Sequence, residues 1–223
     1  MACTSAQSSS APPVDEQRSA ERFRLLLRVG KLRTAGGEFL CVLRDVSDQG
    51  VKVRVFHKLP ADKSCELELG SGERFRVTRM WQKDGHAGFR FADGPIAVDR
   101  LIAEVGPFPK RHIRLRLHRP VPLLLIAGEL TLAAQLCDIS QHGAALMLDQ
   151  RLAIGQQVRI EALHLPALHA RVRWRRRGLH GLVFQEGFRL DALAELAARI
   201  QIGDAPGQTR ARSRESSSAL TTD

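Results

Sequence analysis

The chain has 223 residues, of which 43% are hydrophobic and 26% charged; this composition is typical of soluble globular proteins and excludes a wholly disordered chain. Its 34 lysines and arginines outnumber 24 aspartates and glutamates, so the formal net charge is +10 and the surface attracts phosphorylated ligands, polyanions or anionic membranes. The longest apolar run, Val121 to Ala127, is far shorter than the ~20 residues that cross a bilayer, which predicts no transmembrane segment.

Both ends of the chain predict disordered tails. Residues 1–17 are rich in Ser, Ala and Pro and contain neither the basic leader nor the apolar stretch of a signal peptide. Residues 203–223 are rich in Ser, Thr, Gly and Arg and have no apolar periodicity. The four cysteines lie far apart without a CxxC pair, which predicts free thiols. We therefore expect a soluble, cytoplasmic protein.

An internal repeat divides the sequence between these tails. Asp45-Val-Ser-Asp-Gln-Gly50 recurs as Asp138-Ile-Ser-Gln-His-Gly143, an offset of 138 − 45 = 93 residues. The same offset relates three further pairs: Trp81 and Trp174, Gly88 and Gly181, and Phe91 and Phe184. A repeat of this length predicts two copies of one fold.

The first copy is predicted to be mostly β. Apolar and polar residues alternate from Val51 to Val55, which is the pattern of a half-buried antiparallel strand. We expect about six such strands, followed by a short helix that carries Ile96, Leu101 and Ile102 on its apolar face.

The second copy begins after Gly106-Pro-Phe-Pro109, which interrupts the preceding helix. It contains an alternating segment from Val158 to Ala162 and ends in a helical pattern with Leu190, Leu193, Leu196, Ala197 and Ile200. The predicted fold class is all-β with short terminal helices. Two antiparallel barrels of about six strands, at 18–106 and 107–202, are each closed by a C-terminal helix.

Each Asp-x-Ser-x-x-Gly hexapeptide lies between two strands, which predicts a tight hairpin. In this interpretation Asp and Ser bind backbone N–H groups, and Gly takes a positive φ. Cations four residues apart precede both hexapeptides, at Arg18 and Arg22 and at Lys110 and Arg114. Arginine can chelate a phosphate or a guanine edge and can stack on a purine, so the pairs suit a nucleotide ligand.

This order of motifs, with a closing Gly-x-x-Phe strand and a helix, resembles the PilZ family. The resemblance implies that cyclic di-GMP binds between the cation pair and the hexapeptide turn. In the first copy it implies ligand contacts by Arg18, Arg22, Asp45, Ser47 and Gly50. In the second it implies contacts by Arg114, Asp138, Ser140 and Gly143, with Lys110 in place of an arginine and Arg111 as its neighbouring substitute.

The resemblance also suggests a role for each group. The arginines would neutralise phosphate and stack on guanine, and the aspartates would accept from guanine or orient an arginine. The serines would donate to a phosphate or shape the turn, and the glycines would let the backbone approach the ligand. Because Lys110 offers only a point charge, we expect the first copy to bind more tightly than the second.

Enzymatic activity has little support in the sequence. The eight histidines do not combine with Cys, Asp or Glu at metal-ligand spacing, and no GxSxG motif occurs. The resemblance implies a bacterial cyclic di-GMP receptor, without a metal or other cofactor, that relays the signal to an effector protein. A degenerate PilZ scaffold that binds only proteins is the alternative. Nucleic acid is disfavoured as a partner because only 5% of residues are aromatic.

Two features remain outside these motifs. Trp81 and Trp174 are interpreted as barrel core or interdomain packing. The run Arg171-Val-Arg-Trp-Arg-Arg-Arg177 has the densest charge in the chain. It is interpreted as a solvated strand and turn, with a polyanion-binding edge as the alternative.

Overall fold

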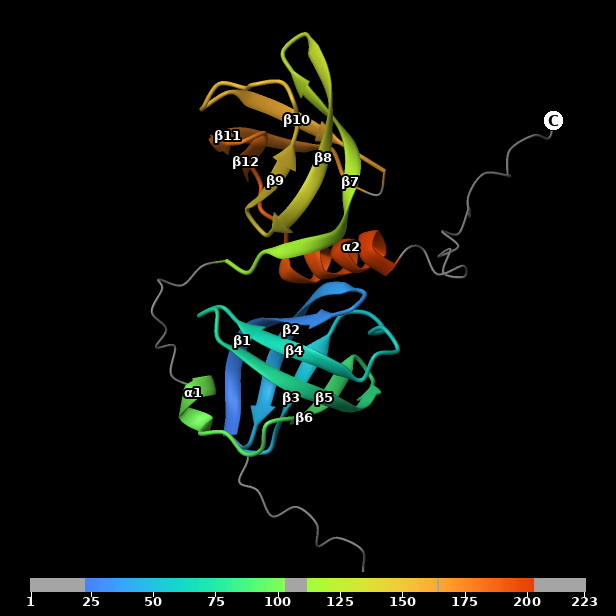
Figure 1. Cartoon of the computed structure of the whole chain (residues 1–223), viewed down its shortest axis with the longest axis vertical. Coiled ribbons are helices and arrows are strands. Elements are labelled where there is room, and N and C mark those ends of the chain that lie inside the picture. Colours follow the sequence, from blue (N-terminus) through green and yellow to red (C-terminus); the bar gives the residue numbers. More distant parts are fainter. Residues whose placement is uncertain (1–22, 103–111, 164, 203–223) are drawn as a thin grey trace, which may run out of the picture. The chain divides into compact units, whose positions relative to one another are not determined.

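The computed structural model describes residues 23–102, 112–163 and 165–202, with the side chains of 23–27, Arg100 and Ile102 left aside (Figure 1). The chain divides into two units, Met1–Leu115 and Arg116–Asp223. The predicted junction at residues 106 and 107 and both predicted tails lie outside the described residues. Among the residues described, no helix is long and apolar enough to span a membrane.

The first unit contains a closed antiparallel barrel of six strands in the order β1-β2-β3-β6-β5-β4. The strands are β1 (Phe23–Thr34), β2 (Gly37–Val46), β3 (Gly50–Val55), β4 (Ser64–Leu69), β5 (Arg74–Lys83) and β6 (His86–Phe91). Their alternation is as predicted, since Val51, Val53 and Val55 are buried whereas Arg54 is exposed. One face of each strand therefore supplies the barrel core.

The second unit contains a second closed barrel of six strands, in the order β10-β11-β12-β9-β8-β7. The strands are β7 (Leu115–Ala127), β8 (Leu130–Ser140), β9 (Gly143–Met147), β10 (Gln157–Glu161), β11 (Leu168–Arg176) and β12 (Leu179–Phe184). Leu125, Leu136, Leu146 and Ile160 are almost completely buried in its core. The predicted fold class is confirmed.

A helix follows each barrel. The five-residue helix α1 (Val98–Ile102) buries Leu101. Ile96 precedes this helix, and its backbone N–H donates to the Asp48 carbonyl oxygen at 2.8 Å. The expectation that Ile96 lies on the helix is therefore wrong. Helix α2 (Leu190–Ile202) buries Leu193, Leu196 and Ala197, as its apolar period predicts.

The repeat offset of 93 residues is preserved in irregular details of the fold. A β-bulge lies between Arg79 and Trp81 on β5, and another lies between Val172 and Trp174 on β11. The turns after these strands place Asp84 and Arg177 at φ of 50° and 48°, in the left-handed region that few non-glycine residues adopt. Positions related by the offset are therefore structurally equivalent and can be compared directly.

Candidate functional site

The hexapeptide turn of the second barrel joins β8 to β9. The Ser140 hydroxyl donates to the Gly143 carbonyl oxygen at 3.0 Å, and Ser140 is only 3% exposed. In the first barrel, the Gly50 N–H donates to the Ser47 hydroxyl oxygen at 3.2 Å, and the Ser47 N–H donates to the Gly50 carbonyl oxygen at 2.9 Å. Both serines therefore bind the turn itself, which supports the predicted shaping role.

The hexapeptide glycines are required by a close approach between strands. A Cβ at Gly143 would lie 2.1 Å from the Leu182 carbonyl oxygen on β12, and one at Gly50 would lie 2.3 Å from the Phe89 carbonyl oxygen on β6. Neither glycine has a positive φ, so the conformation expected from the hairpin interpretation is wrong. The missing side chain matters because a backbone atom occupies its place.

A row of residues crosses the outer wall of the second barrel beside this turn. Trp174 on β11 lies opposite Gly181 on β12, Gly181 lies opposite Ala145 on β9, and Ala145 lies opposite Asp138 on β8. A Cβ at Gly181 would be 2.0 Å from the indole, so the ring lies against the glycine. Between the aromatic ring and the hexapeptide carboxylate, glycine and alanine leave the wall without a side chain larger than a methyl group, and we call this part the floor of the row. The indole covers its Gly181 end, and Ala145 is only 3% exposed.

Both tryptophans lie on the outside of their barrels, so the barrel-core interpretation is wrong. Trp174 is 39% exposed and Trp81 is 46% exposed. In each case the bulge shifts the strand register by one residue, which turns the indole outward. The repeated Trp and Gly were visible in the sequence, but only cross-strand register shows that they touch and share a row with the aspartate.

The first barrel has the same row with one difference. Trp81 lies opposite Gly88, Gly88 lies opposite Lys52, and Lys52 lies opposite Asp45. Lys52 therefore occupies the position of Ala145 (145 − 52 = 93). Its Nζ lies 3.6 Å from the Asp45 Oδ2, and both side chains are partly exposed. A lysine thus covers the floor of the first row and competes for its carboxylate.

The predicted cations are mostly outside the part of the chain that the structure describes. This applies to Arg18, Arg22, Lys110 and Arg111. Arg114 is exposed and immediately precedes β7. The described part of the predicted site is therefore the turn, the wall row and Arg114.

Among the described residues, the side chains of Cys41, Cys65 and His57 provide no second site. Burial raises the pKa of Cys41, and it raises the pKa of the Cys65 thiol to about 11, so both remain protonated near neutral pH. Burial also lowers the pKa of His57, whose ring centroid lies 4.8 Å from that of Phe39. The described residues contain no group of three His, Cys, Asp or Glu side chains that could hold a metal ion.

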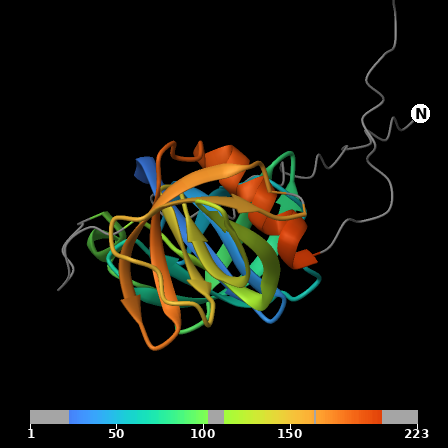
Figure 2. The same ribbon diagram turned by 90° about the horizontal axis from the view of Figure 1, so that it is seen from above.

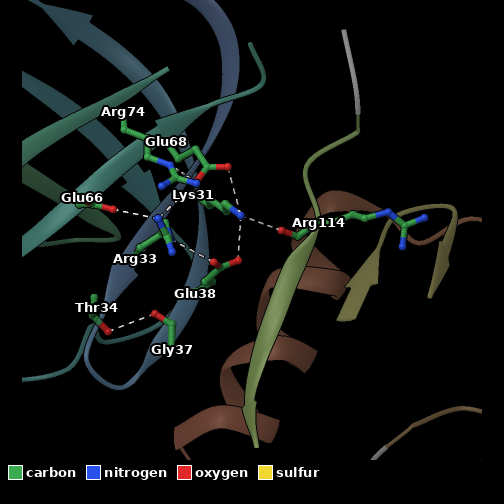
Figure 3. Close-up of polar contacts among 9 residues, drawn as sticks. All are labelled: Lys31, Arg33, Thr34, Gly37, Glu38, Glu66, Glu68, Arg74 and Arg114. Carbon is green, nitrogen blue, oxygen red and sulfur yellow. Dashed lines mark hydrogen bonds and ion pairs between the residues drawn. The ribbon is translucent and has the colours of Figure 1, made fainter. Parts of the chain in front are cut away.

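An ion cluster on β1, β2, β4 and β5 of the first barrel was not predicted (Figure 3). Lys31 Nζ lies 2.8 Å from Glu38 Oε2 and 3.3 Å from Glu68 Oε1, and the Lys31 and Glu38 side chains are each 9% exposed. The cluster comprises Lys31, Arg33, Glu38, Glu66, Glu68 and Arg74. Three cations offset three carboxylates, so we assign the cluster to strand pairing rather than to ligand binding.

An apolar groove of about 760 Å³ lies on the second barrel. Leu124, Met147 and Leu163 line it and are between 47% and 78% exposed, and the carboxylates of Asp149 and Glu161 lie at the same groove. Met147 is two residues from Ala145 on β9, so the groove adjoins the wall row. The repeat did not reveal the groove, because its residues come from four separate segments.

Comparison with known proteins gives a family for the second barrel. Residues 109–201 match the model of the PilZ domain. A structural match is PlzA of Borreliella burgdorferi in complex with c-di-GMP, with 12% identity over 77% of this chain and 87% of that chain, and a TM-score of 0.33. Another is the Bacillus subtilis inhibitor of motility MotI/DgrA, with 14% identity over 81% and 100% of the two chains and a TM-score of 0.34. No curated protein matches the sequence.

Proposed function

We propose that this chain, whose residues 109–201 match the model of the PilZ domain, is a cytoplasmic bacterial receptor for cyclic di-GMP rather than an enzyme. The proposal rests on one observation, that the barrel matched by the PilZ model also contains the row beside the hexapeptide turn. This row consists of Trp174, Gly181, Ala145 and Asp138. The ligand is a dinucleotide with two purines and two phosphates. A flat floor, a carboxylate and nearby cations match that chemistry.

Each group of the second barrel has a distinct role in this proposal. Asp138 accepts N–H groups of a guanine edge. The short side chain of Ala145 leaves room for the base to approach Asp138 beside the indole, which itself covers Gly181. Arg114, Lys110 and Arg111 neutralise the phosphates and cover the ligand. Ser140 and Gly143 hold the turn that aims Asp138, since the Ser140 hydroxyl is already bonded within the turn.

The first barrel is a second proposed site, with Arg18, Arg22, Asp45, Ser47 and Gly50 in the same roles. The pair of arginines favours this site, but Lys52 covers its floor and lies within an ion-pair distance of Asp45. A ligand must displace that lysine before it reaches the carboxylate. Because the ligand must displace Lys52, we propose that the second barrel binds more tightly. This is the reverse of the order expected from the cation pairs alone.

Calorimetric titration with cyclic di-GMP, and with GTP and GMP as controls, tests the proposal. We expect saturable binding of cyclic di-GMP alone, and a loss of at least about tenfold in affinity at the second site for Asp138→Ala, because a guanine edge loses its charged acceptor. Asp149→Ala is the matched control, since this exposed carboxylate lies on the same barrel outside the row. No binding at concentrations on the order of 100 µM would refute the receptor function.

The alternative is a PilZ scaffold that binds a protein without nucleotide. The groove favours this alternative, since exposed Leu124, Met147 and Leu163 beside the Asp149 carboxylate suit an apolar segment that carries a basic residue. The Glu161 carboxylate at the same groove already pairs with Arg159. In the receptor proposal the same groove would relay the signal to the effector protein, because it adjoins the ligand row on β9. The titration separates the two functions, since only the receptor binds cyclic di-GMP.

A further inference from the structure

We infer that the second barrel carries a nucleic-acid-binding surface on the hairpin of β11 and β12. We call this surface the arginine hairpin; it consists of Arg171, Arg173, Arg176 and Arg177. It would bind the phosphodiester backbone of a nucleic acid. Neither Asp138 nor the hexapeptide turn is part of this surface. Nucleic-acid binding here therefore does not depend on cyclic di-GMP binding.

The four arginines are exposed and uncompensated. All four side chains are exposed, and among the described residues none of them forms an ion pair with a carboxylate. Arg175 differs, because its Nη1 donates to the Leu152 carbonyl oxygen. Arg151, the exposed neighbour of Leu152, adds a further cation beside the hairpin. The charge is therefore available to an external anion.

The matching strand of the first barrel shows that the fold does not need these arginines. Residues 78–84 contain two cations and one carboxylate, whereas residues 171–177 contain five arginines and no carboxylate. The cations within residues 78–84 have partners, since Arg79 donates to Gln82 and to the Ala61 carbonyl oxygen and Lys83 lies 3.9 Å from Asp84. The turn residue Arg177 corresponds to Asp84 (177 − 84 = 93), which reverses the charge at an equivalent position.

Backbone geometry places the cations on the outer wall, along one strand and the turn that follows it. Val172 is 1% exposed and points into the core, whereas the bulge after it leaves both Arg173 and Trp174 outside. Arg176 and Arg177 follow at the end of the strand and in the turn. In Figure 1 the orange strands β11 and β12 are neighbours in the wall of the second barrel, and Figure 2 shows the chain from above. An extended ligand could contact several arginines at once.

The chemistry favours a polymer of phosphates over a lipid surface. Guanidinium groups bind phosphate through a planar fork of donors, and a set of separate arginines matches a backbone that repeats its charge. A membrane surface would gain from apolar side chains that insert between lipids. On this strand Val172 is buried and the indole of Trp174 is held against Gly181, so neither can insert.

The low aromatic content of the chain, which disfavours nucleic acid as a partner, is an average over both barrels. The structure shows that the unpaired charge is concentrated on one hairpin, where backbone contacts need cations but not aromatic rings. Composition is therefore a poor guide to this surface.

The test measures anisotropy of a short fluorescein-labelled duplex DNA with the full chain, across a salt series. Arg171→Gln with Arg177→Gln should weaken binding about tenfold and reduce the salt slope by about 2, because each cation at a phosphate contributes about 1. Lys58→Gln with Lys63→Gln is the matched control, since these exposed lysines of the first barrel remove the same net charge. That control should change binding little.

Three outcomes would overturn the inference. They are no DNA binding at low salt, equal weakening by the control pair, or binding of phosphatidylserine vesicles through the same arginines without DNA binding. Melting temperature checks that the variants fold. Arg177→Asp provides a second probe that the left-handed turn accepts, since Asp84 occupies the matching position. Asp138→Ala should keep its DNA affinity, which separates this surface from the messenger site.

Discussion

The two barrels use matching positions of their outer walls for different purposes. In the first barrel Lys31 on β1 lies opposite Glu68 on β4, within the ion cluster. In the second barrel Leu124 on β7 lies opposite Glu161 on β10, and both line the apolar groove. The offset of 124 − 31 = 93 residues makes the pairs equivalent. Their neighbours Leu32 and Leu125 are both fully buried, so the cores stay alike while the walls diverge.

The rows beside the hexapeptide turns also combine shared residues with one that differs between the barrels. Both barrels keep the tryptophan, the glycine beneath it and the aspartate, but Lys52 in one corresponds to Ala145 in the other. The glycines that meet a neighbouring backbone are also retained in both. Constraints set by backbone proximity therefore persist in both barrels, whereas charge on the outside changes and can give each barrel its own ligand.

The largest expected effect concerns the ion cluster. Lys31→Ala should lower the free energy of unfolding of the first barrel by about 3 kcal/mol, because it leaves the buried Glu38 and the half-buried Glu68 short of a cation. Lys83→Ala is the control. The Lys83 side chain is 81% exposed, and its Nζ lies 3.9 Å from Asp84 Oδ2, so its loss should change stability little. Urea unfolding measures both. Equal stability of the two variants would mean that the cluster contributes nothing.

The glycines should be equally sensitive in both barrels. Gly50→Ala and Gly143→Ala should each destabilise their own barrel by about 2 kcal/mol, because the new methyl group meets a carbonyl oxygen of the next strand. Gly36→Ala is the control, since its Cβ would make an ordinary contact with Pro60. Thermal unfolding of each variant measures the effect. A harmless Gly143→Ala would show that the strands separate easily.

Exchanging the residues of the row should reverse the ranking of the two sites. Ala145→Lys should weaken cyclic di-GMP binding by the second barrel about tenfold, since the lysine covers the floor and can pair with Asp138. Lys52→Ala should strengthen binding by the first barrel by about fivefold at most, because an exposed ion pair contributes little. Calorimetry on the full chain resolves the two sites. Unchanged affinities would show that this position does not set the ranking.

The smallest expected effect is at the cation before the second barrel. Lys110→Arg should strengthen the second site by about threefold, because a guanidinium adds a stacking face and a second phosphate bond. If Arg111 already supplies these contacts, Lys110→Arg will have no effect and Arg111→Ala will be the damaging change. The same titration distinguishes the two residues.

Much of the fold was predictable because its signals are local. Alternation from Val51 to Val55 predicts a strand with one buried face, and the period of Leu193, Leu196 and Ala197 predicts helix α2. The hexapeptides predicted the turns at Ser47 and Ser140. In each case, residues within a few positions of one another determine the conformation.

The sequence by itself determined the duplication, the strand pattern and the hexapeptide turns, since all three are repeated or periodic along the chain. Only the tertiary structure decided that Trp174 faces outward against Gly181, that Lys52 reaches Asp45, and that Lys31 joins carboxylates on two other strands. These contacts depend on bulges and on the register between strands. A shift of one residue would turn each side chain to the opposite face, and no local pattern specifies that register.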